Sequence, residues 1–252
     1  MSAAKPMSGG KLLGVGVGPG DPELMTLKAM RALGEADVIA HFAKAGNASH
    51  SRAIVAQHLR ADVTELPLYY PVTTELPTCS DGYRDAIRDF YDGAAAAIAT
   101  HLDAGRVVGV ICEGDPLFYG SYMHLHARLA PRFATEIVAG VTGMSGCWSA
   151  AGMPIAQGDD VFTVLPATLP EGELTRRLTE ADAAVVMKVG RHLPKLRRAL
   201  DRSGRLPRAI YVERGTMADA KMIPLASKPD DDAPYFAVVL VPGWAGRPGG
   251  KP

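Results

Sequence analysis

Short apolar segments alternate with segments of helical periodicity over residues 11–152, and this alternation constrains the fold more than any other feature. The segment "RVVGVIC" (106–112) is almost entirely apolar, as expected of a strand buried on both faces of a sheet. Ser49 is a suitable N-cap for one helix, and Gly105 is suited to end another. Strands are predicted at 11–17, 37–42, 63–71, 106–112 and 135–141, and helices at 22–36, 49–59, 81–105, 120–130 and 143–152. Such alternation predicts a parallel sheet with helices on both faces.

A turn-rich stretch, "GMPIAQGDD", predicts a domain boundary, and the alternation then resumes. The last two strands of this second half have no obvious helix between them, which favours a mixed sheet. Strands are predicted at 161–167, 181–189, 208–214 and 234–242, with helices at 171–178 and 192–204. The predicted fold is therefore α/β with two domains, 11–153 and 159–243, between a flexible N-terminus (1–10) and a flexible tail (244–252).

Charge and cysteine content narrow the class of protein. Lysine plus arginine equals aspartate plus glutamate at 27 each, which gives no support for nucleic-acid or membrane-surface binding. Three cysteines without a CxxC pair favour a reducing compartment over a disulfide framework or a cysteine-rich zinc site. The first residues contain no apolar leader, and no apolar run approaches the roughly 18 residues of a membrane-spanning helix. These observations predict a cytoplasmic location.

The first predicted strand runs into a glycine-rich turn, "GVGVGPGDP". A dinucleotide-binding G-x-G-x-x-G pattern fails here, because the third glycine position is Pro19 when counted from Gly14 and Asp21 when counted from Gly16. A phosphate-binding P-loop fails as well, since no Gly-Lys-Ser/Thr follows. Glycines alone fit a tight strand–helix turn without a ligand about as well as a binding loop.

Two further strand-end turns have a similar character. In "ICEGDPLFYGS", Asp115 follows a buried strand, where it could accept hydrogen bonds from a ligand or serve only as a cap or turn residue. In "VAGVTGMSGCWSAAG", Thr142 and Ser145 supply hydroxyls beside open backbone. The carboxyl ends of parallel strands are where open α/β sheets bind ligands, so the three turns together predict one shared site.

Familiar catalytic signatures are missing from the sequence. It contains no G-x-S-x-G, no H-E-x-x-H and no His/Cys cluster with metal-ligand spacing, so we expect no bound metal. His124 and His126 fall within a predicted helix and fit packing or surface positions better than ligation. The sequence thus indicates a site that binds and orients its ligands.

The segments "GVGPGDPELMTLKA", "EGDPLFYGS", "GVTGMSG", "VVMKVGR" and "VERGT", in this order and over nearly the whole chain, resemble the tetrapyrrole methylase family. Its members methylate uroporphyrinogen-derived macrocycles with S-adenosylmethionine. Within the family, "CEGDPLFYGSYMHLHARL", "LYYPVTTE" and "AVVMKVGRHLPKLRRAL" are most similar to the precorrin-2 C(20)-methyltransferases of cobalamin synthesis. The resemblance implies methylation of precorrin-2 at carbon-20 to give precorrin-3A.

The resemblance also implies an arrangement of ligands: two α/β domains with a trough between them, a homodimer, and a folded cofactor held mainly by backbone groups. Carried over onto this chain, the S-adenosylmethionine contacts are Pro19, Glu113, Gly114, Asp115, Phe118, Thr142, Gly143, Met187, Lys188 and Gly215. Gly20 and Asp21 of the first turn are assigned to the macrocycle. On this interpretation the glycine-rich turn has no phosphate to bind.

One position departs from the family pattern. Relatives that methylate uroporphyrinogen carry a Tyr-Asp pair after the second strand, whereas this chain has His41-Phe42, so a carboxylate base cannot be transferred. We predict direct, in-line attack of an electron-rich meso carbon on the sulfonium methyl group, followed by proton loss to water or to a nearby group such as His41. The substrate's carboxylates favour nearby cations. Candidates are Lys44, Arg52, Arg84, Arg88, Arg191 and Arg214.

Other functions remain alternatives at this point. Within the class, the substrate could be cobalt-factor II or another corrin carbon could be methylated. A nicotinamide-dependent oxidoreductase would need the missing G-x-G-x-x-G. A non-catalytic tetrapyrrole-binding protein would bind the macrocycle without transferring a methyl group.

Overall fold

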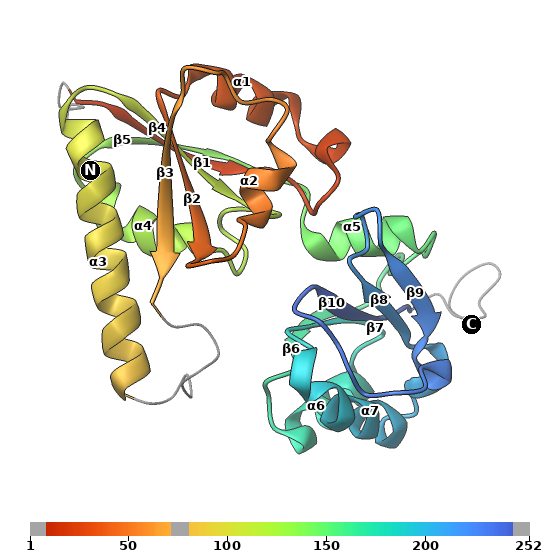
Figure 1. Cartoon of the computed structure of the whole chain (residues 1–252). Helices are drawn as coiled ribbons and strands as arrows, with labels where there is room; N and C mark the ends of the chain where they lie inside the picture. Colours follow the sequence, from red (N-terminus) through yellow and green to blue (C-terminus); the bar gives the residue numbers. More distant parts are fainter. Residues whose placement is uncertain (1–8, 72–80, 244–252) are drawn as a thin grey trace. The chain divides into compact units, whose positions relative to one another are not determined.

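The computed structural model describes residues 9–71 and 81–243 (Figure 1). The predicted flexible tail, 244–252, and most of the predicted flexible N-terminus lie outside the described residues. The chain divides into two compact units, with the division after Thr142.

The first unit is built on a five-stranded parallel sheet, which confirms the prediction from the alternating pattern (Figure 1). Its strands lie in the order β3-β2-β4-β1-β5. Their bounds are β1 (Lys11–Gly16), β2 (Val38–Lys44), β3 (Thr64–Tyr70), β4 (Val107–Cys112) and β5 (Ala134–Val138). Because β4 lies between β2 and β1, while β5 lies on the far side of β1, the carboxyl ends of β4, β1 and β5 are neighbours.

Helices cover both faces of this sheet. On one face, α1 (Leu27–Glu35) and α2 (His50–Ile54) enclose a core with Leu13, Ile39 and Ile111. On the other, α3 (Asp81–Asp103) and α4 (Tyr122–Leu129) pack on alternate strand residues. The alternation of side chains along each strand therefore divides this unit into two hydrophobic clusters.

Capping residues set where the helices begin and end. The predicted helix over 22–36 is in fact a 3₁₀ turn, η1 (Pro22–Leu24), followed by α1, because Thr26 has an extended backbone and its hydroxyl accepts from the Ala29 N–H at 3.0 Å. Ser49 caps α2 as predicted, accepting from the Arg52 N–H at 3.4 Å. Gly105 follows α3 with a φ of +80° and its N–H donates to the Leu102 carbonyl.

The second unit has a five-stranded sheet in the order β6-β7-β10-β8-β9. Its mixed character confirms the prediction, whereas β9 was not predicted. Among the described strands of this sheet, β6 and β7 are parallel neighbours and the other three pairs are antiparallel. The elements are α5 (Gly143–Ala150), β6 (Phe162–Pro166), α6 (Glu171–Glu180), β7 (Ala183–Met187), η2 (Gly190–His192), α7 (Leu193–Arg202), η3 (Leu206–Arg208), β8 (Ile210–Glu213), β9 (Lys221–Pro224), η4 (Leu225–Ser227) and β10 (Ala237–Val241).

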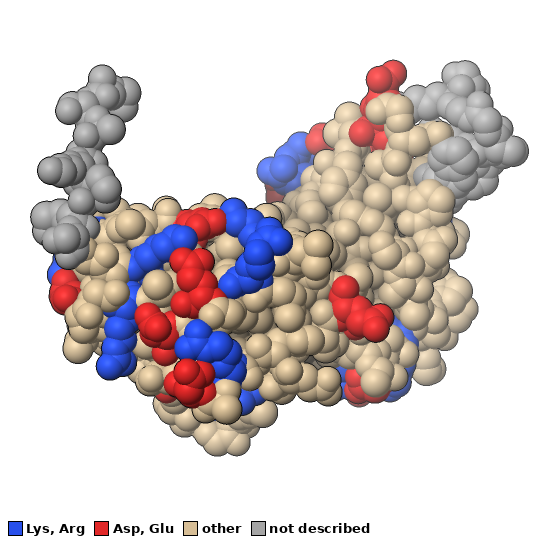
Figure 2. All heavy atoms as spheres, turned by 90° about the horizontal axis from the view of Figure 1, so that it is seen from above, with Lys and Arg blue, Asp and Glu red and all other residues tan. Residues whose placement is uncertain are grey.

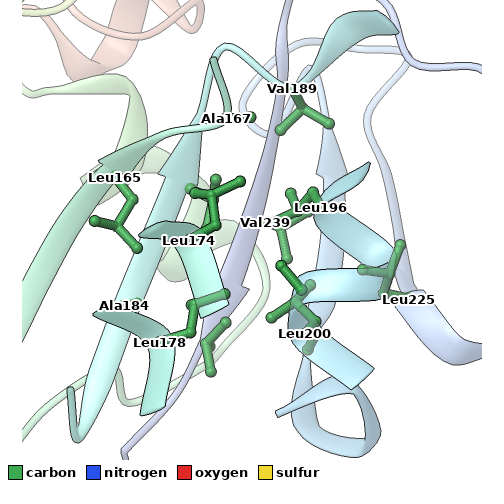
Figure 3. Close-up of a cluster of buried hydrophobic side chains, with 14 of the residues drawn as sticks. Leu165, Ala167, Leu174, Leu178, Ala184, Val189, Leu196, Leu200, Leu225 and Val239 are labelled. Carbon is green, nitrogen blue, oxygen red and sulfur yellow. The ribbon is translucent and has the colours of Figure 1, made fainter. Parts of the chain in front are cut away.

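Two hydrophobic clusters stabilise this unit. On one face, Leu174 of α6 and Leu196 and Leu200 of α7 pack against sheet residues such as Val239 (Figure 3). On the other, Cys147 of α5 is buried beside Val185, Val212 and Leu240. The helix α5 thus packs with the second sheet, whereas the sequence-based limits place it at the end of the first domain.

Candidate functional site

The turns that follow β1 and β4 are joined by backbone hydrogen bonds. The Val17 N–H donates to the Cys112 carbonyl at 2.9 Å, and the Gly114 N–H donates to the Gly18 carbonyl at 2.8 Å. Gly18 and Gly114 form an isolated antiparallel bridge just beyond the parallel strands. Two of the three predicted site turns are therefore held together by main-chain atoms.

The third turn joins them through glycine-to-glycine contact. A Cβ on Gly16 would lie 2.6 Å from both the Gly114 carbonyl oxygen and the Gly140 nitrogen. A Cβ on Gly140 would lie 2.0 Å from the Gly114 oxygen and 2.8 Å from the Gly16 Cα. We call these three residues the glycine contact; it brings the ends of β1, β4 and β5 together, as the sequence predicts, at a spacing that excludes side chains.

Asp115 ties two of these turns together. Its Oδ1 accepts from the Leu117 N–H at 2.9 Å, the local pattern of a turn residue, and its Oδ2 accepts from the Gly140 N–H at 3.2 Å. The turn-forming alternative for this carboxylate is therefore present in the structure. A carboxylate has additional lone pairs, so these bonds leave capacity for a ligand hydroxyl.

Other predicted site residues of the first unit lie within a few positions of Gly16 or Gly114 along the chain. Asp21 caps η1, because its carboxylate accepts from the Glu23 N–H at 2.9 Å. Gly18 and Gly20 have φ values of +83° and +143°, which require glycine, with the half-buried Pro19 between them. The half-buried Phe118 packs edge-on against Tyr119 at 4.9 Å between ring centroids.

Three non-glycine residues with left-handed backbone fall within the resembling motifs. The φ values are 54° at Tyr119, 56° at Lys188 and 51° at Arg214. Each such conformation costs about 1–3 kcal/mol in a non-glycine residue, and this kind of strain clusters at functional sites. The strained backbone at these three residues supports the assignment of their turns to a functional site. This support comes from backbone conformation and is separate from the sequence motifs.

Glu113 and His41 lie on the same face of the first sheet as α2. His41 pairs in register with Ile111, two residues before Glu113. Burial raises the pKa of Glu113, while the charge of His50 and the Ser51 N–H, which donates to the carboxylate, oppose that rise. Burial lowers the pKa of His41, with a smaller opposing effect from Glu65.

In the second unit, the predicted residues share one edge of the sheet. Because β7 and β8 both run antiparallel to β10, which lies between them, Met187–Lys188 and Gly215 follow strand ends at the same edge. A Cβ on Gly215 would lie 2.7 Å from the Cys147 Sγ, so this turn packs directly on α5. Gly143 begins α5, and Thr142 precedes it.

The six predicted substrate-binding cations occupy different local settings. Arg52 is bound to Glu65, and Arg214 forms an ion pair with Asp219. On α3, Arg84 and Arg88 pair with aspartates of the same helix. Lys44 ends β2 and Arg191 lies in η2, both exposed. On the face of the first unit seen in Figure 2, basic and acidic side chains are interspersed.

Sequence reasoning missed several residues that build this site. Gly16 was visible only as one of four alternate glycines, and Gly140 had no distinguishing pattern. The ion-pairing role of Glu65 depends on β3 lying beside β2, which no local motif encodes.

Cavities of about 770 and 320 Å³ lie in the second unit, near β8 and β9, and none of the predicted site residues lines them. Over residues 9–71 and 81–243, no group of three or more His, Cys, Asp or Glu side chains is arranged to hold a metal ion. Within the same ranges, no helix has the length and apolar character needed to cross a membrane.

Comparisons with known proteins give matches over most of this chain. The model for Tetrapyrrole (Corrin/Porphyrin) Methylases matches residues 11–228. A precorrin-2 C(20)-methyltransferase of Sinorhizobium sp. is 63% identical over 239 residues, covering 95% of this chain and 98% of the relative.

Two solved structures share the fold. A cobalt precorrin-4 methyltransferase aligns with a TM-score of 0.71 at 22% identity, covering 94% of this chain and 96% of that one. A uroporphyrin-III C-methyl transferase from Thermus thermophilus, complexed with S-adenyl homocysteine, aligns with a TM-score of 0.63 at 23% identity, covering 92% and 96%. At such identities the structural likeness concerns the fold alone. The family match over most of its length shows that this chain belongs to the tetrapyrrole (corrin/porphyrin) methylases.

Proposed function

We propose that this protein transfers a methyl group from S-adenosylmethionine to carbon-20 of precorrin-2, giving precorrin-3A in cobalamin biosynthesis. The observation that carries the proposal is the 63% identity to a precorrin-2 C(20)-methyltransferase over nearly the full length of both chains. That relative is named for the metal-free substrate, which favours precorrin-2 over a cobalt-loaded macrocycle.

The glycine contact supports the proposed cofactor site. It brings the ends of β1, β4 and β5 together without side chains between them, at the edge where open α/β sheets bind ligands. Glu113, Gly114, Asp115 and Phe118 follow β4 at this edge and are the first-unit residues that we assign to S-adenosylmethionine, together with Pro19. Thr142, Gly143, Met187, Lys188 and Gly215 remain predicted contacts.

The chemistry requires orientation more than a covalent catalyst. S-adenosylmethionine supplies an electrophilic methyl group, and the reduced macrocycle already has a nucleophilic meso carbon. Rigid backbone turns around the glycine contact hold the reactants in line, and such positioning can supply about 7–11 kcal/mol of a barrier. His41, kept neutral by its buried setting, is the proposed acceptor for the proton lost from carbon-20.

The macrocycle's carboxylates are proposed to be held by cations near the site, with Gly20 and Asp21 beside them. Lys44 and Arg52 lie on elements next to β4, whereas Arg84 and Arg88 lie on α3 with their own acidic partners.

We also propose that the protein is a homodimer, on the strength of the resemblance. Sedimentation equilibrium tests this proposal, and a monomer at all concentrations would contradict it.

Incubation with methyl-labelled S-adenosylmethionine and freshly prepared precorrin-2, followed by NMR of the product, tests the proposal. Label at carbon-20 is the expected result. Label at another carbon would retain the class and overturn the regiochemistry. Methyl transfer only to the cobalt-loaded macrocycle would show that this macrocycle, and not precorrin-2, is the substrate. Binding of the macrocycle without any methyl transfer would indicate a carrier protein.

A further inference from the structure

Two segments that carry the family resemblance meet at one hydrogen bond. Tyr70, in "LYYPVTTE", is the last residue of β3, and Ser121, in "EGDPLFYGS", directly precedes α4. Their side-chain hydroxyl groups form a hydrogen bond in which either oxygen can be the donor, although the residues are 51 positions apart. In the sheet, β2 lies between β3 and β4, the strand that leads to Ser121. The bond therefore connects the outermost strand with the turn that follows β4.

The Ser121 hydroxyl does not have the role that a serine before a helix usually has. Such a serine normally has extended backbone and accepts from an N–H of the first helical turn, as Ser49 does at α2. Ser121 instead has helical backbone, with φ −65° and ψ −23°, and its hydroxyl makes no capping hydrogen bond to α4, all of whose residues are described. This hydroxyl thus contributes a contact across the fold in place of a local one.

Aromatic packing fixes the ring that carries the other hydroxyl. The Tyr70 ring stacks on Phe42 of β2, with 5.6 Å between the centroids and 22° between the planes, and lies 4.6 Å from the Phe90 ring of α3. Tyr91 of α3 meets it edge-on, and the Tyr91 hydroxyl is 3.4 Å from the Tyr70 hydroxyl. Because these rings belong to a hydrophobic cluster of the first unit, the phenol oxygen is a fixed anchor for Ser121.

The turn formed by residues 113–121 has a strained half next to this anchor. The glycine contact holds its first half against the ends of β1 and β5. In its second half, Tyr119 has left-handed backbone with φ 54°, and a Cβ on Gly120 would lie 2.7 Å from the Pro116 carbonyl oxygen. Left-handed backbone in a non-glycine residue persists only where its surroundings impose it. The bond to Tyr70, two residues after Tyr119, supplies such a constraint.

A proposed cofactor contact lies in the strained half of the turn. Phe118 is three residues before Ser121, and its ring packs edge-on against that of Tyr119 with 4.9 Å between the centroids. If Ser121 moved away from Tyr70, the backbone at Tyr119 could relax and Phe118 would move with it. The place of this proposed contact thus depends on a hydroxyl from another strand.

We propose that Tyr70 is a positioning residue for the methyl donor: through Ser121, it holds residues 113–121 in the conformation that contacts S-adenosylmethionine. The inference rests on the proposed function, in which four residues of this turn bind the cofactor. Loss of either hydroxyl leaves the aromatic packing and the glycine contact in place, but it releases the second half of the turn. The consequence is weaker binding of the methyl donor by a protein that remains folded.

Hydrogen exchange of the full-length protein tests the anchor without a ligand. The readout is the exchange rate of the Leu117 and Phe118 amides, which are hydrogen-bonded within the turn. Y70F and S121A should each raise this rate about 3- to 10-fold, as expected for the loss of one hydrogen bond, while amides of β4 keep their wild-type rates. The control is Y91F, which removes a different phenol hydroxyl near Tyr70 and should leave the turn unchanged. Wild-type rates in both Y70F and S121A would overturn the proposal.

Calorimetric titration with S-adenosylhomocysteine tests the positioning role. Y70F and S121A should each raise the Kd about 3- to 10-fold. The double variant Y70F/S121A should raise it no further than either single variant, because both substitutions remove the same bond. Y91F should bind as the wild type does. A double-variant effect equal to the product of the two single effects, or an equal loss of affinity in Y91F, would overturn the proposal.

Steady-state kinetics separates positioning from a general loss of folded protein. Y70F should raise the KM for S-adenosylmethionine and leave the KM for precorrin-2 unchanged, whereas a smaller folded fraction would lower kcat alone. A lowered kcat with both KM values unchanged would therefore overturn the proposal. A wild-type protein that binds no S-adenosylhomocysteine, or transfers no methyl group, would instead overturn the proposed function, whatever the exchange rates of the variants.

Discussion

Gly16, Gly114 and Gly140 bring three chain segments closer together than any side chain permits. The Gly114 carbonyl oxygen lies where a Cβ of either neighbour would be placed. Real Cβ contacts at 2.0–2.6 Å do not occur, so even alanine at Gly16 or Gly140 must displace backbone. At Gly114 the φ of +67° favours glycine for a different reason, since other residues rarely adopt this backbone conformation.

G140A should lower the free energy of unfolding by about 1–3 kcal/mol and weaken S-adenosylhomocysteine binding, because the ends of β1, β4 and β5 must separate. The matched control is G34A, since a Cβ on Gly34 in α1 meets nothing within 4 Å and alanine there should stabilise by about 0.5–1 kcal/mol. Urea unfolding and calorimetric titration give the two quantities. Equal stability of the two variants would contradict this account of the glycine contact.

Single residues also show where prediction from sequence stops. The Asp-Pro turn, the Ser49 cap and the Gly105 helix end follow from local chemistry, and the structure confirms all three roles. The partner of His41 could not be predicted, because Glu65 reaches it only through the pairing of β2 with β3. Local rules identify turns and caps, whereas contacts across a sheet require the strand order.

At the scale of elements, the predicted strands are found in the structure, and the described residues contain one strand that was missed, the short edge strand β9. The strand β9 has only four residues, with exposed Lys221 and Met222, and pairs on one side with β8. Its segment has neither a buried run nor clear alternation, so periodicity could not distinguish it from a loop. The split of the first helix was missed for a related reason, since Leu24 and Leu27 keep helical spacing across the Thr26 cap.

A carboxylate on β5 joins three elements of the first unit. Glu136 lies 2.8 Å from the Lys11 Nζ of β1 and 2.7 Å from the Lys28 Nζ of α1. Hydrogen bonds from Lys11 and then Lys28 hold the pKa of Glu136 at about 2, below its ordinary 4.5. The bridge is partly exposed, so solvent and salt weaken it.

This bridge predicts an acid-dependent loss of stability. A depressed carboxylate pKa stabilises the folded state above pH 4.5, and this contribution disappears as pH falls toward 2. E136Q should therefore be less stable than the wild type by under about 1 kcal/mol at pH 6 and should match it near pH 2. Urea unfolding at several pH values measures the difference. The control is D103N, which removes the exposed Arg132–Asp103 pair; its difference in stability from the wild type should not disappear as the pH falls. If E136Q were less stable than the wild type by the same amount at every pH, the proposed effect of the Glu136 bridge would be wrong.

At the scale of the whole molecule, each unit encloses its own hydrophobic clusters. Leu12 and Ile39 belong to clusters of the first unit, whereas Leu196 and Val239 belong to a cluster of the second. L196A, at a fully buried position on α7, should destabilise the second unit by about 2–5 kcal/mol.

Hydrogen exchange locates that loss within the chain. In L196A, amides of β7 and β10 should lose protection while those of β1 and β4 keep theirs. M222A, at an exposed position on β9, is the control and should change neither set. A parallel loss in β1 and β4 would show that the two units unfold as one cooperative structure.

An edge built from main-chain atoms is largely insulated from mutation. Every codon except those for proline specifies the same N–H and C=O groups, so substitutions around the glycine contact can change its surroundings without changing the hydrogen-bonding groups it presents. A mutation of one of its glycines adds a Cβ, and selection removes such a mutation because the added atom breaks the packing. Selection can therefore exchange the side chains around the glycine contact while the edge that we propose for the methyl donor keeps the same main-chain groups.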